Sequence, residues 1–313
     1  MTMTVSLALL LLGVLAAVVA PRLMSRAEWP ELEPVVALWV WQCVVAAVLL
    51  SFALSMIFSA AAAWGAVRGH VFAPAPQGVM EAYALGAHRP WSAVIAVVLA
   101  SGGLWTAAML SREIHRARRR RRQGRKDLLV RSPVLPGEEP GGAPLVVLEA
   151  ERPDAWWLPG TAPQLVITTA ALRRLKGRQL DAVLAHEQGH ARARHDWLRH
   201  CSGALANGFP QVPVFAAFRD EMHRLVELAA DDVASRRFGR RTIALALVEL
   251  NEDRGVFGPG TTPDAQVPQR VNRLLSSVPR LTAGRRLRLT AAAALVPVIP
   301  LIIAFGPGLR ALG

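Results

Sequence analysis

Cysteine, tyrosine and lysine are nearly absent from this sequence of 313 residues. It contains two cysteines, Cys43 and Cys201, and a single tyrosine. Two isolated cysteines exclude both the framework of a disulfide-rich secreted domain and a cysteine-based metal site. Lysine occurs only at positions 126 and 176, so arginine supplies nearly all of the basic charge. This composition is compatible with a domain in the reducing cytosol.

Charged residues are also scarce, at 19% of the chain, whereas hydrophobic residues reach 52% and the mean hydropathy is +0.30. The chain is therefore too apolar for an ordinary soluble enzyme. Long uncharged runs predict three membrane helices within residues 1–110, at about 3–20, 35–63 and 91–110, and a fourth within 288–313. No lysine or arginine precedes the first run, so we expect a retained span and not a cleaved signal peptide.

A dense arginine cluster follows the third predicted span, in residues 111–131. Such a cluster anchors the cytoplasmic end of a membrane helix and binds anionic lipid. We therefore expect a basic juxtamembrane linker there, a cytoplasmic domain over residues 132–287, and both chain termini outside a cell membrane. An arm that binds nucleic acid directly is the weaker interpretation, because the cluster is tied to a membrane exit.

The sequence His-Glu-Gln-Gly-His, which begins at His186, is the central feature of this domain. On a helix, His186 and His190 are one turn apart and point the same way, which suits two ligands of a Zn²⁺ ion. Glu187 lies about 100° further round the helix, where it can act as a general base on water. The flanking residues, Ala182–Ala185, favour a helix. The chemistry that this motif predicts is peptide hydrolysis.

A catalytic zinc needs a third protein ligand. The predicted helix over residues 220–238 offers Glu227 and Asp231, which are one turn apart and share a face. We predict that Glu227 binds the zinc and that Asp231 holds the second ring nitrogen of a ligand histidine. Glu221 points elsewhere on this helix. The neighbours of Glu227 are apolar, which disfavours a purely solvated acidic face.

Short strands are predicted before the motif helix, at residues 146–149, 155–158 and 164–168, with the last two joined as a hairpin. An extended substrate would most naturally add to the middle strand. The predicted substrate-binding residues are Ala155, Trp156, Trp157 and Leu158. The alternative is that both tryptophans belong to the core. The expected fold class is α+β: a multi-pass α-helical membrane protein whose mostly helical zinc metallopeptidase domain carries a small β-sheet.

The group that stabilises the transition state must be a histidine or an arginine, because the only tyrosine, Tyr83, is predicted to lie outside. The candidates are His223, His195 and Arg270. The apolar segment at residues 203–218 is too short to span a bilayer. We expect it to lie at the membrane interface or beneath the domain.

Three motifs together resemble the BlaR/MecR-type membrane metallopeptidases. They are Ala-Val-Leu-Ala-His-Glu-x-x-His at 182–190, Glu-Leu-Ala-Ala-Asp-Asp-x-Ala at 227–234 and Arg-Val-x-Arg-Leu-Leu at 270–275. The resemblance covers about residues 90–310. HtpX-type proteases are related and share the Glu-x-x-x-Asp pattern.

This resemblance implies a zinc endopeptidase whose substrate is a cytosolic winged-helix repressor of the BlaI/MecI type. The roles that it implies are zinc binding by His186, His190 and Glu227, catalysis by Glu187, and support from Asp231. Antibiotic-sensing members carry a penicillin-binding domain after the last span, and here about four residues follow Leu309. We therefore do not expect β-lactam sensing of that kind.

Two alternatives remain open. The first is an HtpX-like protease that degrades damaged membrane proteins. The second is a signalling protein without catalytic activity, in which the zinc is structural. A structural site would be closed by a fourth side chain and would have no use for Glu187 beside an open position.

Overall fold

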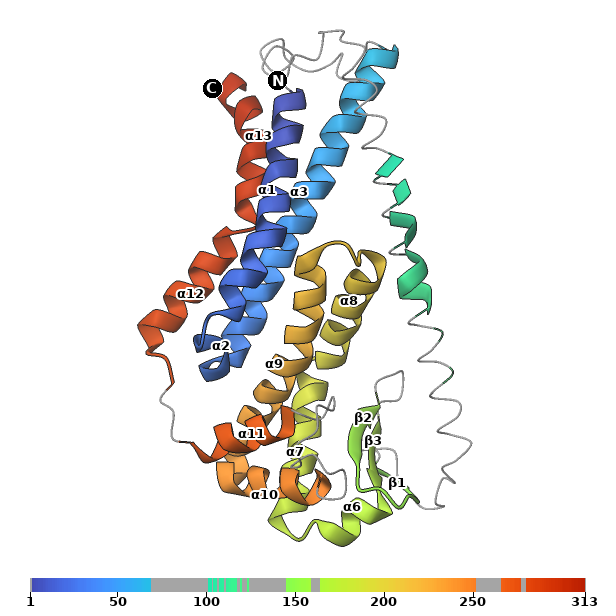
Figure 1. The fold of residues 1–313 in the computed structure, drawn as a ribbon, viewed down its shortest axis with the longest axis vertical. Helices are drawn as coiled ribbons and strands as arrows, with labels where there is room; N and C mark the ends of the chain where they lie inside the picture. Colours follow the sequence, from blue (N-terminus) through green and yellow to red (C-terminus); the bar gives the residue numbers. More distant parts are fainter. Residues whose placement is uncertain are drawn as a thin grey trace.

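The computed structural model describes residues 2–68, scattered positions between 101 and 123, and residues 145–158, 164–251, 266–276 and 280–312. These residues are mostly helical, with one small sheet (Figure 1). The elements are α1 (Thr2–Ser25), α2 (Trp29–Leu32), α3 (Pro34–Arg68), β1 (Leu145–Leu148), β2 (Ala155–Leu158), β3 (Gln164–Thr168), α6 (Thr169–Arg174), α7 (Arg178–Arg192), α8 (His195–Gly208), α9 (Pro213–Phe238), α10 (Arg240–Asn251), α11 (Gln266–Leu275), α12 (Ala283–Leu295) and α13 (Val298–Leu312).

Helices α1 and α3 are each long and apolar enough to cross a bilayer, over Thr4–Ser25 and Pro34–Ala61. They lie side by side and approach closely at Gly13, where an added Cβ would come within 3.2 Å of the Ser51 Cβ. The buried hydroxyl of Ser6 bonds to the hydroxyls of Ser55 and Ser59 at 2.9 and 2.7 Å. Small residues and shared hydroxyl groups of this kind hold helices together in lipid.

The fourth span predicted within residues 288–313 is divided between two helices. Helices α12 and α13 meet at a short break with a bend of 44°. They are long and apolar enough to cross a bilayer only when both are counted as one broken span. Pro297 and Pro300 lie at this break, and proline removes the backbone donors that a continuous helix needs. The third predicted span and the basic linker lie largely outside the described residues.

The predicted strands are confirmed, and they form one sheet in the order β1-β3-β2. β2 pairs antiparallel with β3, as the predicted hairpin requires, whereas β1 pairs parallel with β3. Thr168 ends β3 and begins α6: its buried hydroxyl accepts from the amides of Asp154 and Ala171 and donates to the carbonyl of Arg152. The central strand β3 packs through Ile167 on α6, α7 and α10. Among the described strands, β2 is left as an edge beside α7.

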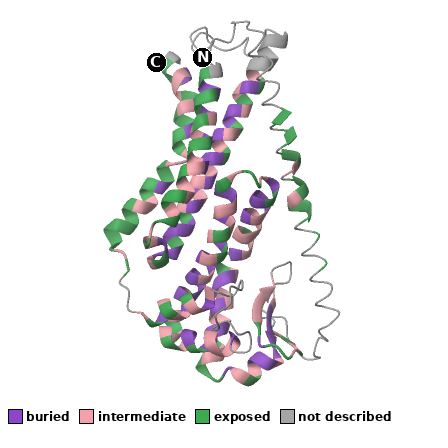
Figure 2. Ribbon diagram, viewed as in Figure 1, coloured by how far each residue is buried: buried purple, intermediate pink, exposed green. Residues whose placement is uncertain are grey.

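Helix α9 is longer than the predicted helix over residues 220–238, because it begins at Pro213. Proline fits the first turn of a helix. The added turns carry Val214, Phe215 and Phe218, which are buried against α1 and α3. Further along, Ala234 of α9 packs in a second cluster with residues of α7, α10 and α11. One helix therefore joins α1 and α3 to α7, α10 and α11 (Figures 1 and 2).

Candidate active site

Helix α7 carries the two histidines of the central motif on its buried face. His186 and His190 point the same way, as predicted, and their Nε2 atoms are 3.1 Å apart. Gly177, with a φ of 51°, precedes the helix, and Asp181 lies in its first turn. Arg194, with a φ of 51°, turns the chain directly into α8. This turn returns His195 to the side of His190.

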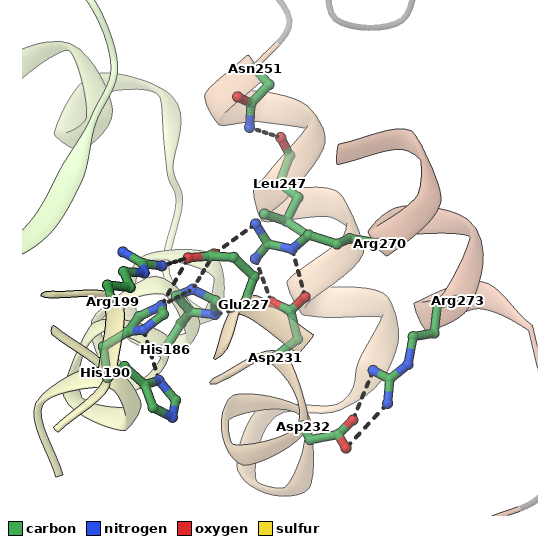
Figure 3. Close-up of polar contacts among 11 residues, drawn as sticks. His186, His190, Arg199, Glu227, Asp231, Asp232, Leu247, Asn251, Arg270 and Arg273 are labelled. Carbon is green, nitrogen blue, oxygen red and sulfur yellow. Dashed lines mark hydrogen bonds and ion pairs between the residues drawn. The ribbon is translucent and has the colours of Figure 1, made fainter. Parts of the chain in front are cut away.

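Helix α9 brings the predicted third ligand to the same point (Figure 3). Glu227 Oε2 lies 3.4 Å from His186 Nε2, and Glu227 Oε1 lies 3.4 Å from His190 Nε2. The two Nε2 atoms thus lie 3.1 Å apart, and each lies 3.4 Å from a different oxygen of the Glu227 carboxylate. Tetrahedral zinc with bonds of about 2.0 to 2.2 Å separates its ligands by about 3.3 to 3.6 Å. Two imidazoles and one carboxylate at this spacing fit such an ion and leave its fourth position for a substrate or water.

The second ring nitrogen of each motif histidine lies close to another polar side chain. His186 Nδ1 lies 3.0 Å from Oδ1 of the fully buried Asp231, the residue predicted to hold it, but the geometry is not that of a hydrogen bond. His190 Nδ1 lies 2.9 Å from Nδ1 of His195. Such contacts fix the ring orientation and leave Nε2 free for a metal. His195, a predicted transition-state stabiliser, therefore lies behind a ligand and away from the open face of the site.

Arg270 of α11 closes the back of the site and uses all three of its nitrogens. Its Nε and one terminal nitrogen donate to Asp231 at 2.8 and 2.7 Å, and the other terminal nitrogen lies 2.9 Å from Glu227 Oε2. Burial would raise the pKa of both carboxyls, but Arg270 outweighs it: the pKa of Asp231 falls to about 2 and that of Glu227 falls well below its usual value. Both carboxylates are therefore ionised at neutral pH.

The pKa of His186 shows what these carboxylates do to a ligand. Burial lowers it, but the contacts with Asp231 and Glu227 outweigh burial and, without a bound metal, raise the pKa of His186 to about 10. His195 behaves in the opposite way, because burial and the neighbouring His190 lower its pKa to about 3. Charge and burial thus move the pKa values of these two histidines in opposite directions.

Glu187 points from α7 toward the sheet. Its Oε2 accepts a hydrogen bond of 3.0 Å from the backbone amide of Trp157 on the edge strand β2. Burial raises the pKa of Glu187, although His186 and His190 oppose this shift. A carboxyl group next to a metal position, with a pKa raised toward neutrality, can both accept and return a proton.

A cleft with a volume of about 330 Å³ opens over these groups. Of the predicted substrate-binding residues, Ala155, Trp156 and Trp157 line it, whereas Leu158 does not. His223 is exposed on α9 and, like His195, is absent from the lining. Arg270 is the one predicted transition-state stabiliser that reaches the cleft.

Arg199 is a residue of the site that reasoning from the sequence missed. Its guanidinium makes a very short contact with Glu227 Oε1 and lines the cleft. The buried Nε of Arg199 has no hydrogen-bond partner among the described residues. A signal was present, since Arg199 lies one helical turn after His195 and therefore shares its face. The sequence does not show that this face turns back onto the motif.

The comparison with protein families supports this geometry. Residues 115–288, more than half of the chain, match the model of Peptidase family M48. No curated protein and no solved structure matches the chain.

The ligand set predicts how metal content responds to substitutions on α9. Glu227→Ala should remove most of the bound zinc, measured as metal per protein after dialysis. Asp231→Asn should weaken zinc binding about 10 to 100 fold, because it releases the ring of His186. Glu221→Ala is the matched control, since Glu221 pairs with Arg224 on the same helix and touches none of the ligands. Loss of metal from Glu221→Ala alone would show that the assigned ligand is wrong.

The raised pKa of His186 predicts a pH dependence of metal affinity. At pH 7 its proton must leave before Nε2 can bind zinc, so binding should release about one proton from this group. The affinity should therefore rise up to about tenfold per pH unit until the pH approaches the pKa of about 10.

Calorimetry of zinc binding in two buffers with different ionisation enthalpies counts these protons. Asp231→Asn removes the contact that most raises the pKa of His186, so zinc binding to this variant should release fewer protons. Equal proton counts in both proteins would contradict the assignment.

Proposed function

Because the chain belongs to peptidase family M48, we propose that it is a membrane-anchored zinc endopeptidase that cleaves a regulatory protein at the cytoplasmic face of a membrane. The observation that carries this proposal is that the ring nitrogens of His186 and His190 converge on the two oxygens of Glu227, with Glu187 beside them. A zinc held there leaves one position open, which distinguishes a catalytic site from a structural one.

Glu187 performs the proton transfers in this mechanism. Zinc, when bound, supplies a Lewis acid that polarises the scissile carbonyl and makes water acidic. Glu187 accepts the proton of the attacking water and donates it to the nitrogen of the leaving amine, so the carboxyl group returns to its ionised form. Its raised pKa suits both halves of this cycle.

The edge strand β2 is the proposed binding site for an extended substrate. All four residues of β2 pair with β3 on one side of the strand, and the backbone amide of Trp157 donates to Glu187. A substrate strand that adds here places its backbone along the cleft. The contact between Trp157 and Glu187 then breaks, which frees the carboxylate for the proton transfer.

Arg199 is the proposed donor to the carbonyl oxygen of the substrate. All three nitrogens of Arg270 already contact Asp231 or Glu227. Arg199 is more exposed to the cleft, with 33% of its side chain accessible against 10% for Arg270. A cation at this place stabilises negative charge that develops on the oxygen.

The proposed localisation follows from the membrane helices and the arginine cluster in residues 111–131. Basic residues collect on the cytoplasmic side of membrane proteins. The peptidase domain then faces the cytoplasm, and both chain ends face outside. From there the enzyme reaches cytosolic or membrane-adjacent chains.

Two biological roles fit such an enzyme. A regulator of the BlaR/MecR type cleaves one repressor, of the winged-helix BlaI/MecI type, at a defined bond. A quality-control protease of the HtpX type attacks many unfolded chains. We favour the regulator, because residues 227–238 follow the BlaR/MecR pattern of the resemblance.

Glu187→Ala separates catalysis from metal binding. This variant should keep its zinc and lose cleavage, because Glu187 is not a ligand. Fragments found in the cytosolic proteome of cells with the wild-type protein, and absent with Glu187→Ala, identify the substrate. Full cleavage by a zinc-loaded Glu187→Ala protein would exclude this role. Rapid degradation of unfolded casein by the purified protein would favour quality control over regulation.

Arg199→Gln tests the donor to the carbonyl oxygen. The kcat should fall about 10² to 10³ fold, as when one such donor is lost elsewhere, while zinc content stays close to that of the wild type. Arg192→Gln is the matched control, since Arg192 is exposed at the end of α7. If zinc content falls in proportion to activity, Arg199 only supports Glu227, and the assignment fails.

A further inference from the structure

The hairpin of α8 and α9 ends in a long stretch without charge. From Cys201 to Phe218 the chain has no acidic residue, lysine, arginine or histidine. Charged residues resume at once on both sides, at His200 and Arg219. From the sequence we expect this segment to lie at the membrane interface or beneath the domain. Lipid surrounds it in the first case and protein covers it in the second.

The hairpin packs directly against the membrane helices. Leu205 of α8 and Phe215 and Phe218 of α9 share one buried cluster with residues of α1 and α3, among them Trp41 and Val48. The rings of Trp41 and Phe218 are 6.2 Å apart. Figure 1 shows the turn between α8 and α9 beside the middle of α3 and not at its end.

The depth of the turn follows from the rise of about 1.5 Å per helical residue. Trp41 lies about 10 Å along α3 from Pro34, and Phe218 lies about 8 Å along α9 from Pro213. α3 and α9 run in opposite directions (Figure 1), so the turn lies about 18 Å above Pro34. The span Pro34–Ala61 exceeds a hydrocarbon core of about 30 Å by about 12 Å. Even if all of this surplus lies on the cytoplasmic side, the turn is still about 6 Å inside the core.

Charged contacts mark the boundary below the turn. Arg224 of α9 bonds to Glu31, just before α3, at 2.9 Å, and Glu33 lies 3.4 Å from Arg286 of α12. The charged residues of α9 nearest to the turn are Arg219 and Asp220, which form an ion pair. Between this pair and the tip of the turn, the α8–α9 hairpin carries no charge.

The backbone of the turn leaves few hydrogen-bond donors unpaired, which lipid requires. Phe209, Val212 and Phe215 donate their amides to backbone carbonyls within the turn. Pro210 and Pro213 have no amide hydrogen.

We propose that the α8–α9 turn is inserted into the hydrocarbon of the bilayer as a re-entrant hairpin. α9 then holds Glu227 about 14 Å below Phe218, so the cleft lies close to the membrane surface. The enzyme should therefore act on bonds near the bilayer, a consequence that deepens the proposed function and rests on it. The insertion itself does not depend on peptidase activity.

Site-directed labelling in lipid vesicles tests the insertion with the full chain. Cys43→Ala and Cys201→Ala remove the native cysteines, and Gln211→Cys places an environment-sensitive fluorophore at the exposed tip of the turn. Leu49→Cys, exposed near the middle of α3, is the lipid control, and Glu151→Cys in the peptidase domain is the water control.

The Gln211 label should be quenched by doxyl-labelled phosphatidylcholine as strongly as the Leu49 label, and at least twofold more than the Glu151 label. Iodide should quench it at least twofold less than the Glu151 label. Strong quenching by iodide would place the turn in water. Weak quenching by both agents would place it beneath protein, and either result overturns the proposal. Glu187→Ala should give the same quenching, so an inactive enzyme does not affect this test.

A second pair of variants needs no cysteine-free background. In vesicles Gln211→Asp should lower the melting temperature by several degrees relative to Gln211→Leu, because a buried charge is costly in hydrocarbon. Glu151→Leu should leave it unchanged. Equal melting temperatures for the two Gln211 variants would contradict the insertion.

Discussion

The pairing of Arg270 with Asp231 and Glu227 is the interaction on which the rest of the site depends. A buried guanidinium beside the buried Asp231 and the partly buried Glu227 is costly unless its partners are present. Together with the neighbouring histidines, it keeps the pKa values of both carboxyls low, so both stay ionised. It also ties α11 to α9, because Arg270 and Asp231 are 39 residues apart in the chain. Loss of any member would leave an unpaired charge in the interior.

Helix α9 extends this constraint to the membrane. Its first half lies against α1 and α3, and its second half carries Glu227 and Asp231. Arg273, one turn after Arg270, bonds both to Asp232 and to the backbone carbonyl of Glu31. Glu227 and Asp231 are therefore linked to the segment between α1 and α3 by helices and ion pairs, without an intervening flexible tether.

Sequence reasoning worked best where the chemistry is local. The positions of His186, Glu187 and His190 on one helix follow from their spacing alone, since one turn separates the two histidines. The relation between Glu227 and Asp231 follows from the same rule. It worked less well for Arg199 and His195, because the direct turn at Arg194 decides that their helix folds back onto the motif. It also began α9 too late in the chain, since the apolar turns before residue 220 pack on helices far away in sequence.

The sequence by itself determined that two histidines share one helix face with a glutamate beside them, that Glu227 and Asp231 share another face, and that α1 and α3 are strongly apolar. Each of these depends on residue identity and helical periodicity. Only the tertiary structure decided that α9 meets α7 with its carboxylates facing the histidines, that Arg199 and Arg270 share Glu227, and that the α8–α9 turn lies beside the middle of α3. These outcomes depend on how helices pack. That packing is set by the fit of many side chains from distant segments, and no local pattern encodes it.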